Sequence, residues 1–280
     1  MAEEPPAPTV LAGWRLQRPL GQGAIGSVHL AEGHGHALPV ALKIVPLDAS
    51  GGLAEAQQAF VASGLVAQHL HHPDIVAVHA VGTEGATGWI AMEAVPGGDL
   101  ARYAERARLL PEPVLARVVA RVARALAHAH RQGVVHRDIK PANVLVDWGT
   151  DTVKLVDFGL ARSGDTAQTG TGIVPGTPAY MAPEQLAGNL PTARSDLYAL
   201  GVLLFQLRSG RLPHEAATMG ALLKQVATQA APPLSAVATG VSPALERLVQ
   251  RLLAKRPAER PADAEEVAAV LRALALPAAP

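Results

Sequence analysis

Two short polar stretches carry side chains that could act together on a phosphate group. The first holds Asp138, Lys140 and Asn143, and it lies between two apolar runs. An aspartate can accept a proton, a lysine can bind a phosphate oxygen, and an asparagine amide can bind a metal ion. The second stretch begins with Asp157, at the end of the next apolar run, where its carboxylate would suit a hard cation.

A third candidate is a run of glycines near the N-terminus. Residues 21–28 read Gly-Gln-Gly-Ala-Ile-Gly-Ser-Val, and the missing side chains would let backbone N–H groups approach phosphate oxygens. A helix would follow the third glycine in a dinucleotide-binding unit, whereas Ser27–Leu30 has the pattern of a strand. The glycines alone fit an ordinary hairpin equally well. Lys43 ends the next strand pattern, where its ammonium could reach the α- and β-phosphates.

The first part of the chain must position the glycines and Lys43. It is rich in Gly, Val and His, and short apolar runs such as 40–45 and 89–92 predict strands separated by glycine turns. One alanine-rich segment, 53–70, has the length of a helix and ends before His72-Pro73. We therefore expect a β-rich part with a single main helix.

The remainder of the chain has a helical character. The segments 99–131, 196–207, 242–253 and 263–274 predict helices, and Pro96-Gly97-Gly98 reads as the hinge before them. We predict an α+β protein with a small β-rich part at 11–95 and a larger helical part at 96–275. A flexible lead, 1–10, and a short tail, 276–280, frame these two parts. Ligands favour the clefts between such parts.

Composition excludes several classes of function. The chain has 24 basic and 24 acidic residues, so nothing indicates a surface for nucleic acid or membrane. It has no cysteine, which excludes disulfides, thiolate metal sites and a cysteine nucleophile and suits the reducing cytoplasm. Its most apolar stretch, 197–207, is about half the ~20 residues that a membrane-spanning helix needs, so we predict a buried helix there.

Taken in order, these motifs resemble the eukaryotic-type protein kinase superfamily, in its bacterial Hanks-type serine/threonine branch. The likeness covers 14–274 and rests on the glycine loop, Lys43, His-Arg-Asp-Ile-Lys-Pro-Ala-Asn at 136–143, Asp157-Phe158-Gly159 and Ala182-Pro183-Glu184. It implies the bilobal kinase fold, with ATP and Mg²⁺, or Mn²⁺ in its place, bound for transfer to protein substrates. A lysine two residues after the catalytic aspartate is typical of the serine/threonine class.

The resemblance assigns roles to individual residues. Asp138 would be the catalytic base, Lys140 would steady the γ-phosphoryl group, and Asn143 with Asp157 would hold the metal. Met92 would be the gatekeeper of the adenine pocket, a role compatible with a plain core methionine. The implied ATP-binding residues are Gly21, Gln22, Gly23, Ala24, Ile25, Gly26, Val28, Ala41, Lys43, Met92, Glu93, Val95, Asp99, Asn143, Leu145 and Asp157. The implied structural residues are Glu184, Asp196 and Arg260.

The segment between Asp157 and Ala182 resembles an activation loop. It is rich in Gly, Ser and Thr without apolar periodicity, so we expect it to be mobile until it is ordered. Thr169 and Thr171 stand where related kinases carry autophosphorylation sites, although solvated filler is an equally good interpretation of a loop threonine. Arg137 and Arg162 would clamp a phosphate on this loop. Autophosphorylation would fit a homodimer.

The chain departs from the family pattern at Ser63. The family carries a glutamate there, paired with the strand lysine, and Glu55 lies roughly 12 Å along a helix and about 80° around it from that position. Serine offers Lys43 a neutral hydrogen bond but no charge. Two hypotheses follow: an active kinase, which we favour because Asp138 and Asp157 are kept, and a nucleotide-binding scaffold that transfers little phosphate.

Overall fold

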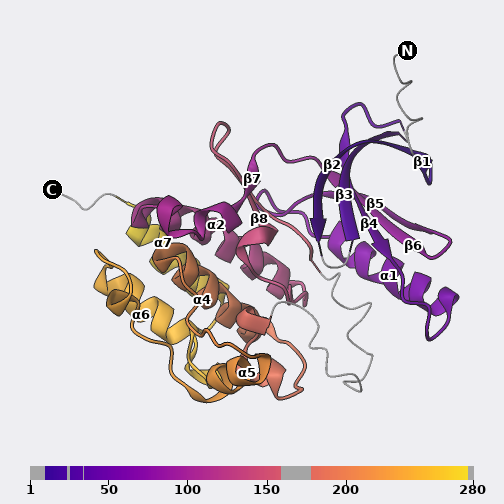
Figure 1. Ribbon diagram of the computed structural model, residues 1–280. Coiled ribbons are helices and arrows are strands. Elements are labelled where there is room, and N and C mark those ends of the chain that lie inside the picture. The colour runs from indigo at the N-terminus through magenta and orange to yellow at the C-terminus, as the bar shows by residue number, and fades with distance from the viewer. Residues whose placement is uncertain (1–9, 24–25, 34, 159–177, 277–280) are drawn as a thin grey trace, which may run out of the picture. The chain divides into compact units, whose positions relative to one another are not determined.

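The computed structural model describes residues 10–23, 26–33, 35–158 and 178–276 (Figure 1). These residues form two compact units. The first contains the chain up to His71 together with Val76–Pro96, and the second contains His72–Ile75 and the described residues from Gly97 onward. A β-rich unit with one helix and a helical unit confirm the predicted α+β class.

The first unit is built on a six-stranded antiparallel sheet in the order β1-β2-β3-β4-β6-β5. Its core contains Trp14 and Leu42, which are fully buried because they lie on the inner face of the pleat. The strands are β1 (Val10–Leu11), β2 (Trp14–Gly23), β3 (Gly26–Gly33), β4 (Val40–Pro46), β5 (Val78–Glu84) and β6 (Thr87–Glu93).

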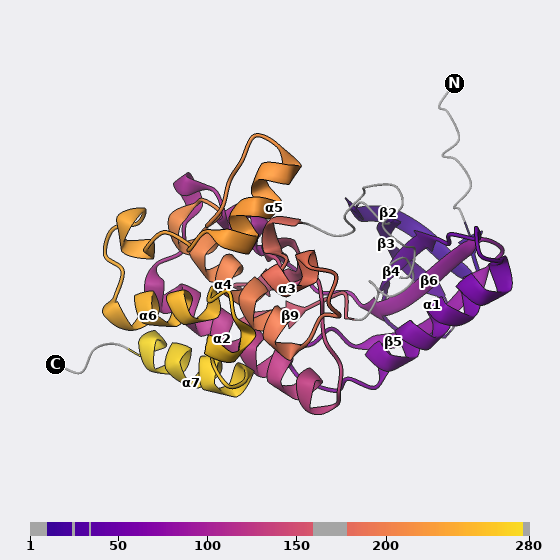
Figure 2. The same cartoon turned by 90° about the horizontal axis from the view of Figure 1, so that it is seen from below.

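Helix α1 (Leu53–Gln68) lies along this sheet beside β5, as both views show (Figures 1 and 2). Two glycines permit this close approach. A Cβ atom at Gly64 would lie 2.6 Å from the side chain of Val81, and one at Gly88 would lie 2.6 Å from Phe60. Helix α1 agrees with the predicted segment 53–70 except for its last two residues.

The second unit is built mainly of helices. These are α2 (Glu112–Arg131), α3 (Pro183–Leu186), α4 (Ala193–Ser209), α5 (Met219–Thr228), α6 (Pro243–Leu252) and α7 (Ala264–Ala275). Helix α7 packs along α2, and α4 contacts both α2 and α6 (Figure 2). A small sheet is formed by β7 (Gly98–Asp99), β8 (Val144–Asp147) and β9 (Thr152–Leu155), in that order.

Two predictions about the helices have clear outcomes. The apolar stretch 197–207 lies inside α4, most of whose side chains are buried, as predicted. None of the helices that the structure describes combines the length and the apolar content that crossing a membrane requires.

The predicted helix 99–131 is wrong in its first third, because two short 3₁₀ turns, Leu100–Tyr103 and Arg106–Arg108, precede α2. Pro111 explains the break, since proline restricts the residue before it and cannot donate within a helix.

Candidate active site

The two predicted catalytic side chains and one predicted metal-binding side chain meet in the loop that leads into β8. Lys140 Nζ lies 2.7 Å from Asp138 Oδ2, and Asn143 Nδ2 donates to Asp138 Oδ2 at 2.9 Å and to the backbone oxygen of Asp138 at 2.7 Å. The Asp138 and Lys140 side chains are 28% and 24% exposed. The carboxylate of Asp138 is therefore held by two partners and still reachable from solvent.

The backbone is held in an unfavourable conformation at two points, Arg137 in this loop and Asp157 after β9. Arg137 has φ 74° and Asp157 has φ 70°, the left-handed region that residues other than glycine seldom occupy. Such strain persists only where the surroundings fix it, and it is concentrated at functional sites. Asp196 on α4 supplies the fixation at Arg137, because its carboxylate accepts the N–H groups of His136 and Arg137, each at 2.8 Å.

His136 ties the catalytic loop to the strand end that carries Asp157. Its Nδ1 accepts the N–H of Asp138 at 3.2 Å, so Nε2 bears the proton and donates to the backbone oxygen of Val156 at 2.8 Å. Burial lowers the pKa of His136 in spite of the nearby charge of Asp196, so the ring is neutral. The N–H of Val156 donates to the Asn143 backbone oxygen at 3.0 Å. Because Val156 directly precedes Asp157, this bond links the segment that carries Asp157 to Asn143.

The first unit brings together part of the predicted nucleotide-binding set. In the register of β3 and β4, Val28 lies opposite Lys43, and Ala41 on β4 lies opposite Met92 on β6. Lys43, Ala41 and Met92 are all buried. Gly23 pairs with Gly26 at the hairpin end. Ala24 and Ile25 lie outside the described residues.

The glycines of the hairpin differ in how closely their neighbours approach. A Cβ atom at Gly26 would lie 2.1 Å from the backbone oxygen of Ile44, and its φ of 151° disfavours side chains as well. A Cβ atom at Gly21 would meet nothing within 4 Å. Glycine is therefore required by the protein itself at 26, whereas at 21 no neighbour in the described chain requires it.

The remaining predicted nucleotide contacts have partners of their own. Glu93 exchanges hydrogen bonds with Ala77, donating its N–H at 2.9 Å and accepting at Oε1 at 3.0 Å. Asp99 Oδ1 accepts the N–H of Ala101 at 2.9 Å and so caps the first 3₁₀ turn. Leu145 lies opposite Asp99 in the small sheet, and Val95 is half-buried.

Ser63 lies on the inner face of α1 and is 7% exposed. Its hydroxyl donates to the backbone oxygen of Ala59 at 3.0 Å, one turn earlier in the same helix. The hydroxyl proton is therefore used within the helix, and Ser63 could meet the Lys43 ammonium only by accepting at its uncharged oxygen. Glu55 lies in the first, exposed turn of α1, so it does not replace the missing buried carboxylate.

The predicted structural ion pair is formed. Arg260 donates to both carboxylate oxygens of Glu184, at 2.7 and 2.8 Å, and Ser195 donates to the first of them at 2.8 Å. Burial opposes the ionisation of Glu184, but these hydrogen bonds outweigh it and lower the pKa of the carboxyl. The Arg260 side chain is fully buried, so the pair is a fixed part of the second unit.

Sequence reasoning missed two residues near the catalytic loop. His130 on α2 places Nε2 2.7 Å from Asp196 Oδ2, a third contact to the aspartate that holds the loop. Tyr180 bonds to Gln206, and burial, with a smaller effect from the charge of Asp138, raises the pKa of Tyr180 to about 12. The predicted phosphosites Thr169 and Thr171 and the predicted clamp residue Arg162 lie outside the described residues.

Residues 14–270 match the family described as the protein kinase domain. The chain belongs to this family. The kinase domain is 44% identical over 253 residues to the serine/threonine-protein kinase PknJ of Mycobacterium tuberculosis, covering 88% of this chain and 42% of that protein. It is 37% identical over 280 residues to pkn3 of Myxococcus xanthus, covering 95% of this chain and 50% of that protein. The same identity extends over 204 residues of PrkC from Bacillus subtilis, covering 72% and 31%.

All three relatives bear the name serine/threonine-protein kinase, which agrees with the branch predicted from Lys140. The kinase domain spans half of their length or less. The comparison therefore identifies a serine/threonine kinase domain. It does not cover the relatives' other segments, or the partners and substrates of those segments.

Proposed function

We propose that this domain transfers the γ-phosphoryl group of ATP to serine or threonine hydroxyls of proteins. The observation that carries the proposal is the carboxylate of Asp138, fixed 2.7 Å from Lys140 Nζ and 2.9 Å from Asn143 Nδ2. A fixed, partly exposed carboxylate can orient a substrate hydroxyl and accept its proton. Lys140 places a positive charge beside it, where it can stabilise negative charge on the transferred group.

Asn143 and Asp157 are the residues that would hold magnesium, or manganese in its place. The amide of Asn143 fits this role because Nδ2 already donates to Asp138, which leaves the carbonyl oxygen as the atom for a cation. When bound, the metal would neutralise charge on the phosphate oxygens. Asp157, whose backbone is held at φ 70°, would add the carboxylate.

The nucleotide would be bound by the β-rich unit through the hairpin of β2 and β3, Lys43 and the strand end at Met92 and Glu93. The open space beside Gly21, which no described neighbour occupies, supports an approach of phosphate to the backbone. The burial of Lys43 supports a role at a ligand more than a role on a solvated surface. Because phosphate transfer consumes ATP, the domain must act in a compartment that contains ATP, and we propose the cytoplasm.

The second candidate function is a nucleotide-binding scaffold, and Ser63 is the observation that favours it. The buried lysine lacks the glutamate of the family pattern, and the Ser63 hydroxyl donates to its own helix. We favour the enzyme because the catalytic loop keeps Asp138, Lys140 and Asn143 in mutual contact. A domain that only bound nucleotide would have no need of a fixed base.

The direct test is transfer of labelled phosphate from magnesium-ATP to a generic basic protein, by the native domain and by the Asp138→Asn variant. We expect the variant to be slower by roughly 100-fold or more, because general base catalysis is worth about that much. ATP binding, followed by thermal shift, serves as the control and should be unchanged. A native domain that binds ATP but transfers no more phosphate than the variant would support the scaffold.

We further propose that the domain phosphorylates its own activation loop at Thr169 or Thr171, within a homodimer, and that Arg137 and Arg162 bind the new phosphate. Mass spectrometry of the purified native domain should find phosphate on one of these threonines, and the Asp138→Asn variant should carry none. Mixing that inactive variant with the native domain tests transfer between copies. A variant that stays unphosphorylated in the mixture would contradict the homodimer.

A further inference from the structure

Helix α2 presents a single basic stripe to solvent. Helices α4 and α7 pack against its other sides (Figure 1). From Leu115 to the end of α2, every residue that is not buried is basic. Five of these residues recur at alternating intervals of four and three positions, so their side chains follow one face of the helix. They are Arg117, Arg121, Arg124, His128 and Arg131.

The N-terminal half of this stripe is neutralised by carboxylates. Arg121 Nε donates to Asp74 Oδ1 at 2.7 Å, and Asp74 is buried. Arg117 Nη2 lies 3.6 Å from Asp151 Oδ1 in a second, exposed ion pair. The first two arginines of the stripe therefore already have a counter-charge within the protein.

The C-terminal half of the stripe has no such counter-charge. Arg124 and Arg131 are exposed and make no hydrogen bond or ion pair with any residue that the structure describes. The ring of His72, in the segment between α1 and β5, lies 5.2 Å from the ring of His128. Burial lowers the pKa of His72, against the charge of Asp74. The charges of His128, Arg124 and Arg131 lower it further, so all three stand close to this ring.

The two histidines each keep an N–H that the described chain does not use. His72 Nδ1 accepts the N–H of Asp74 at 3.0 Å, so Nε2 carries the ring proton. His128 Nε2 lies 2.8 Å from the amide nitrogen of Gln132, which can only donate, so the proton of His128 is on Nδ1. Both residues are half-buried, and solvent reaches these donors. Protonation of either ring would leave the same N–H in place.

The four side chains His72, Arg124, His128 and Arg131 form a compact group, which we call the basic cluster. Arg124 and Arg131 lie four positions before and three positions after His128, where Cβ atoms on a helix are about 5–6 Å apart. The two arginines are thus separated by about 10 Å along the axis, with His128 between them. Their long side chains can reach a single group bound beside the paired imidazole rings.

The size and the donors of the basic cluster indicate the class of ligand. Attachment to an anionic membrane takes about 4–8 basic residues in a row, and here the exposed Asp151 would repel an extended anionic surface. Two guanidinium groups and two imidazole N–H groups exceed what the two oxygens of a carboxylate can use. A phosphate group brings three strong acceptor oxygens and close to two negative charges, and the guanidinium fork matches its geometry.

We propose that the basic cluster binds a single phosphate group, either free or as a monoester. The phosphate oxygens would accept from the guanidinium groups of Arg124 and Arg131, and from the N–H groups of His72 and His128 between them. None of these side chains belongs to the proposed catalytic machinery. Binding at this site is therefore independent of phosphoryl transfer, and it can be measured without ATP.

The test is an NMR titration of the native domain, followed through the imidazole signals of His72 and His128. These signals distinguish the basic cluster from any anion bound at the catalytic loop. The probes are inorganic phosphate and N-acetyl-O-phospho-L-serine N-methylamide, with the unphosphorylated serine compound and the glutamate compound as matched controls. We expect dissociation constants on the order of millimolar for the two phosphates, as for an exposed ion pair. The glutamate compound should bind more weakly, and the serine compound should not bind.

The variants are Arg124→Gln and Arg131→Gln, with Arg117→Gln as the control. Arg117 lies on the same face of the same helix but is paired with Asp151. In about 0.1 M salt, charges more than ~10 Å apart are largely screened, so the control should leave the affinity unchanged. Each of the other two variants should weaken phosphate binding by about threefold or more.

The relative affinity of the two phosphates identifies the source of the ligand, since tighter binding of the serine ester would favour a phosphorylated side chain over the free ion. An absence of saturable shifts at His72 and His128 would overturn the proposal. Equal binding of the glutamate compound, or an equal effect of Arg117→Gln and Arg124→Gln, would show only general attraction of anions. Sedimentation with vesicles that contain phosphatidylserine, without a response to either phosphate, would assign the stripe to a membrane surface instead.

Discussion

At the scale of single residues, the catalytic loop depends on one carboxylate. Asp196 is 1% exposed and accepts from His136 N, Arg137 N and His130 Nε2. A buried charge is costly unless it is fully paired, and here three donors provide the pairing. The same carboxylate holds Arg137 in the left-handed region, so one residue of α4 fixes the backbone from which Asp138 extends.

The residue with the clearest consequence for rate is Ser63. We expect Ser63→Glu to raise kcat/KM by about fivefold, because a charge-assisted hydrogen bond exceeds a neutral one by roughly 1 kcal/mol. Steady-state kinetics with a peptide substrate would measure this. Ser63→Gln is the matched control, since it adds the same volume to the buried face of α1 without charge. Equal rates for the two variants would show that the missing charge does not limit the enzyme.

At the scale of elements, two glycines in the hairpin of β2 and β3 have different roles. Gly26 is needed by the fold, because a Cβ atom there would lie 2.1 Å from Ile44 O, whereas Gly21 has open space around it. We expect Gly26→Ala to lower the melting temperature and the affinity for ATP together. Gly21→Ala should keep the melting temperature within a degree or so and weaken ATP binding only.

Thermal melting and nucleotide titration of both variants provide the measurements. The expected loss of stability for Gly26→Ala is about 1–3 kcal/mol, the usual cost of a strained backbone position. A stable Gly26→Ala variant would mean that β4 can move away from the hairpin. Unchanged ATP affinity in Gly21→Ala would contradict the proposed contact of this backbone with phosphate.

Local signals in the sequence were sufficient for whole elements and for the catalytic loop. Helix α1 and the buried α4 follow from length and apolar content, and Asp138, Lys140 and Asn143 meet because they lie within six residues of one another. Pro111 was overlooked inside a long helical pattern, although its effect on a helix is local and readable.

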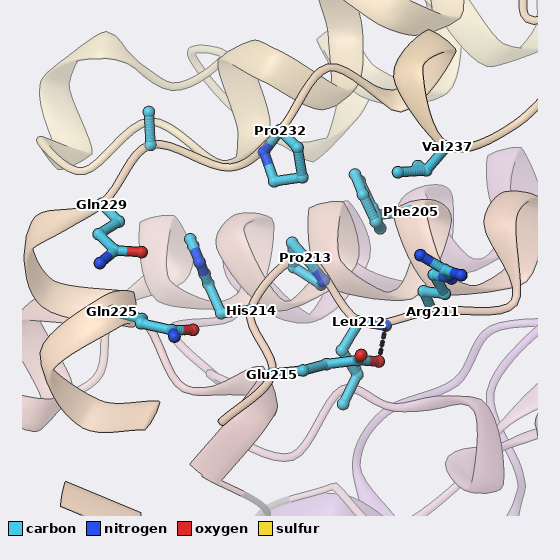
Figure 3. Close-up of a pocket in the computed structure, with 11 residues that line it drawn as sticks. Phe205, Arg211, Leu212, Pro213, His214, Glu215, Gln225, Gln229, Pro232 and Val237 are labelled. Atoms are coloured by element: carbon cyan, nitrogen blue, oxygen red, sulfur yellow. Dashed lines mark hydrogen bonds between the residues drawn. The ribbon is translucent and has the colours of Figure 1, made fainter. Parts of the chain in front are cut away.

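Contacts between distant parts of the chain could not be predicted from spacing. His130 and Asp196 are separated by 66 positions, and His214 and Lys255 by 41. Each pair joins different elements, so no periodicity within one element records it. A cavity beside His214 could not be predicted from spacing either, because its walls come from α4, α5 and the loop that follows α5 (Figure 3).

At the scale of the whole molecule, buried histidines link stability to pH. Both His136 and His214 have lowered pKa values, mainly because burial disfavours the charged ring. The unfolded chain therefore binds more protons than the folded chain once the pH falls below the ordinary histidine value. Stability is therefore greatest above that value and decreases with falling pH. Glu184, whose pKa is lowered, adds a similar loss only at lower pH.

His214 allows this effect to be isolated. Its pKa is about 4 in the folded domain against 6.5 normally, so its contribution is complete above pH 6.5 and is lost progressively as the pH falls toward 4. Allowing for screening by solvent in the cavity, we expect a loss of about 2 kcal/mol over this window. Denaturant titrations at pH 7, 6 and 5 would give the free energy of unfolding of the native domain and of His214→Phe. The variant should lose less stability than the native domain as the pH falls, because phenylalanine takes up no proton; parallel curves would mean that His214 titrates normally in the folded protein.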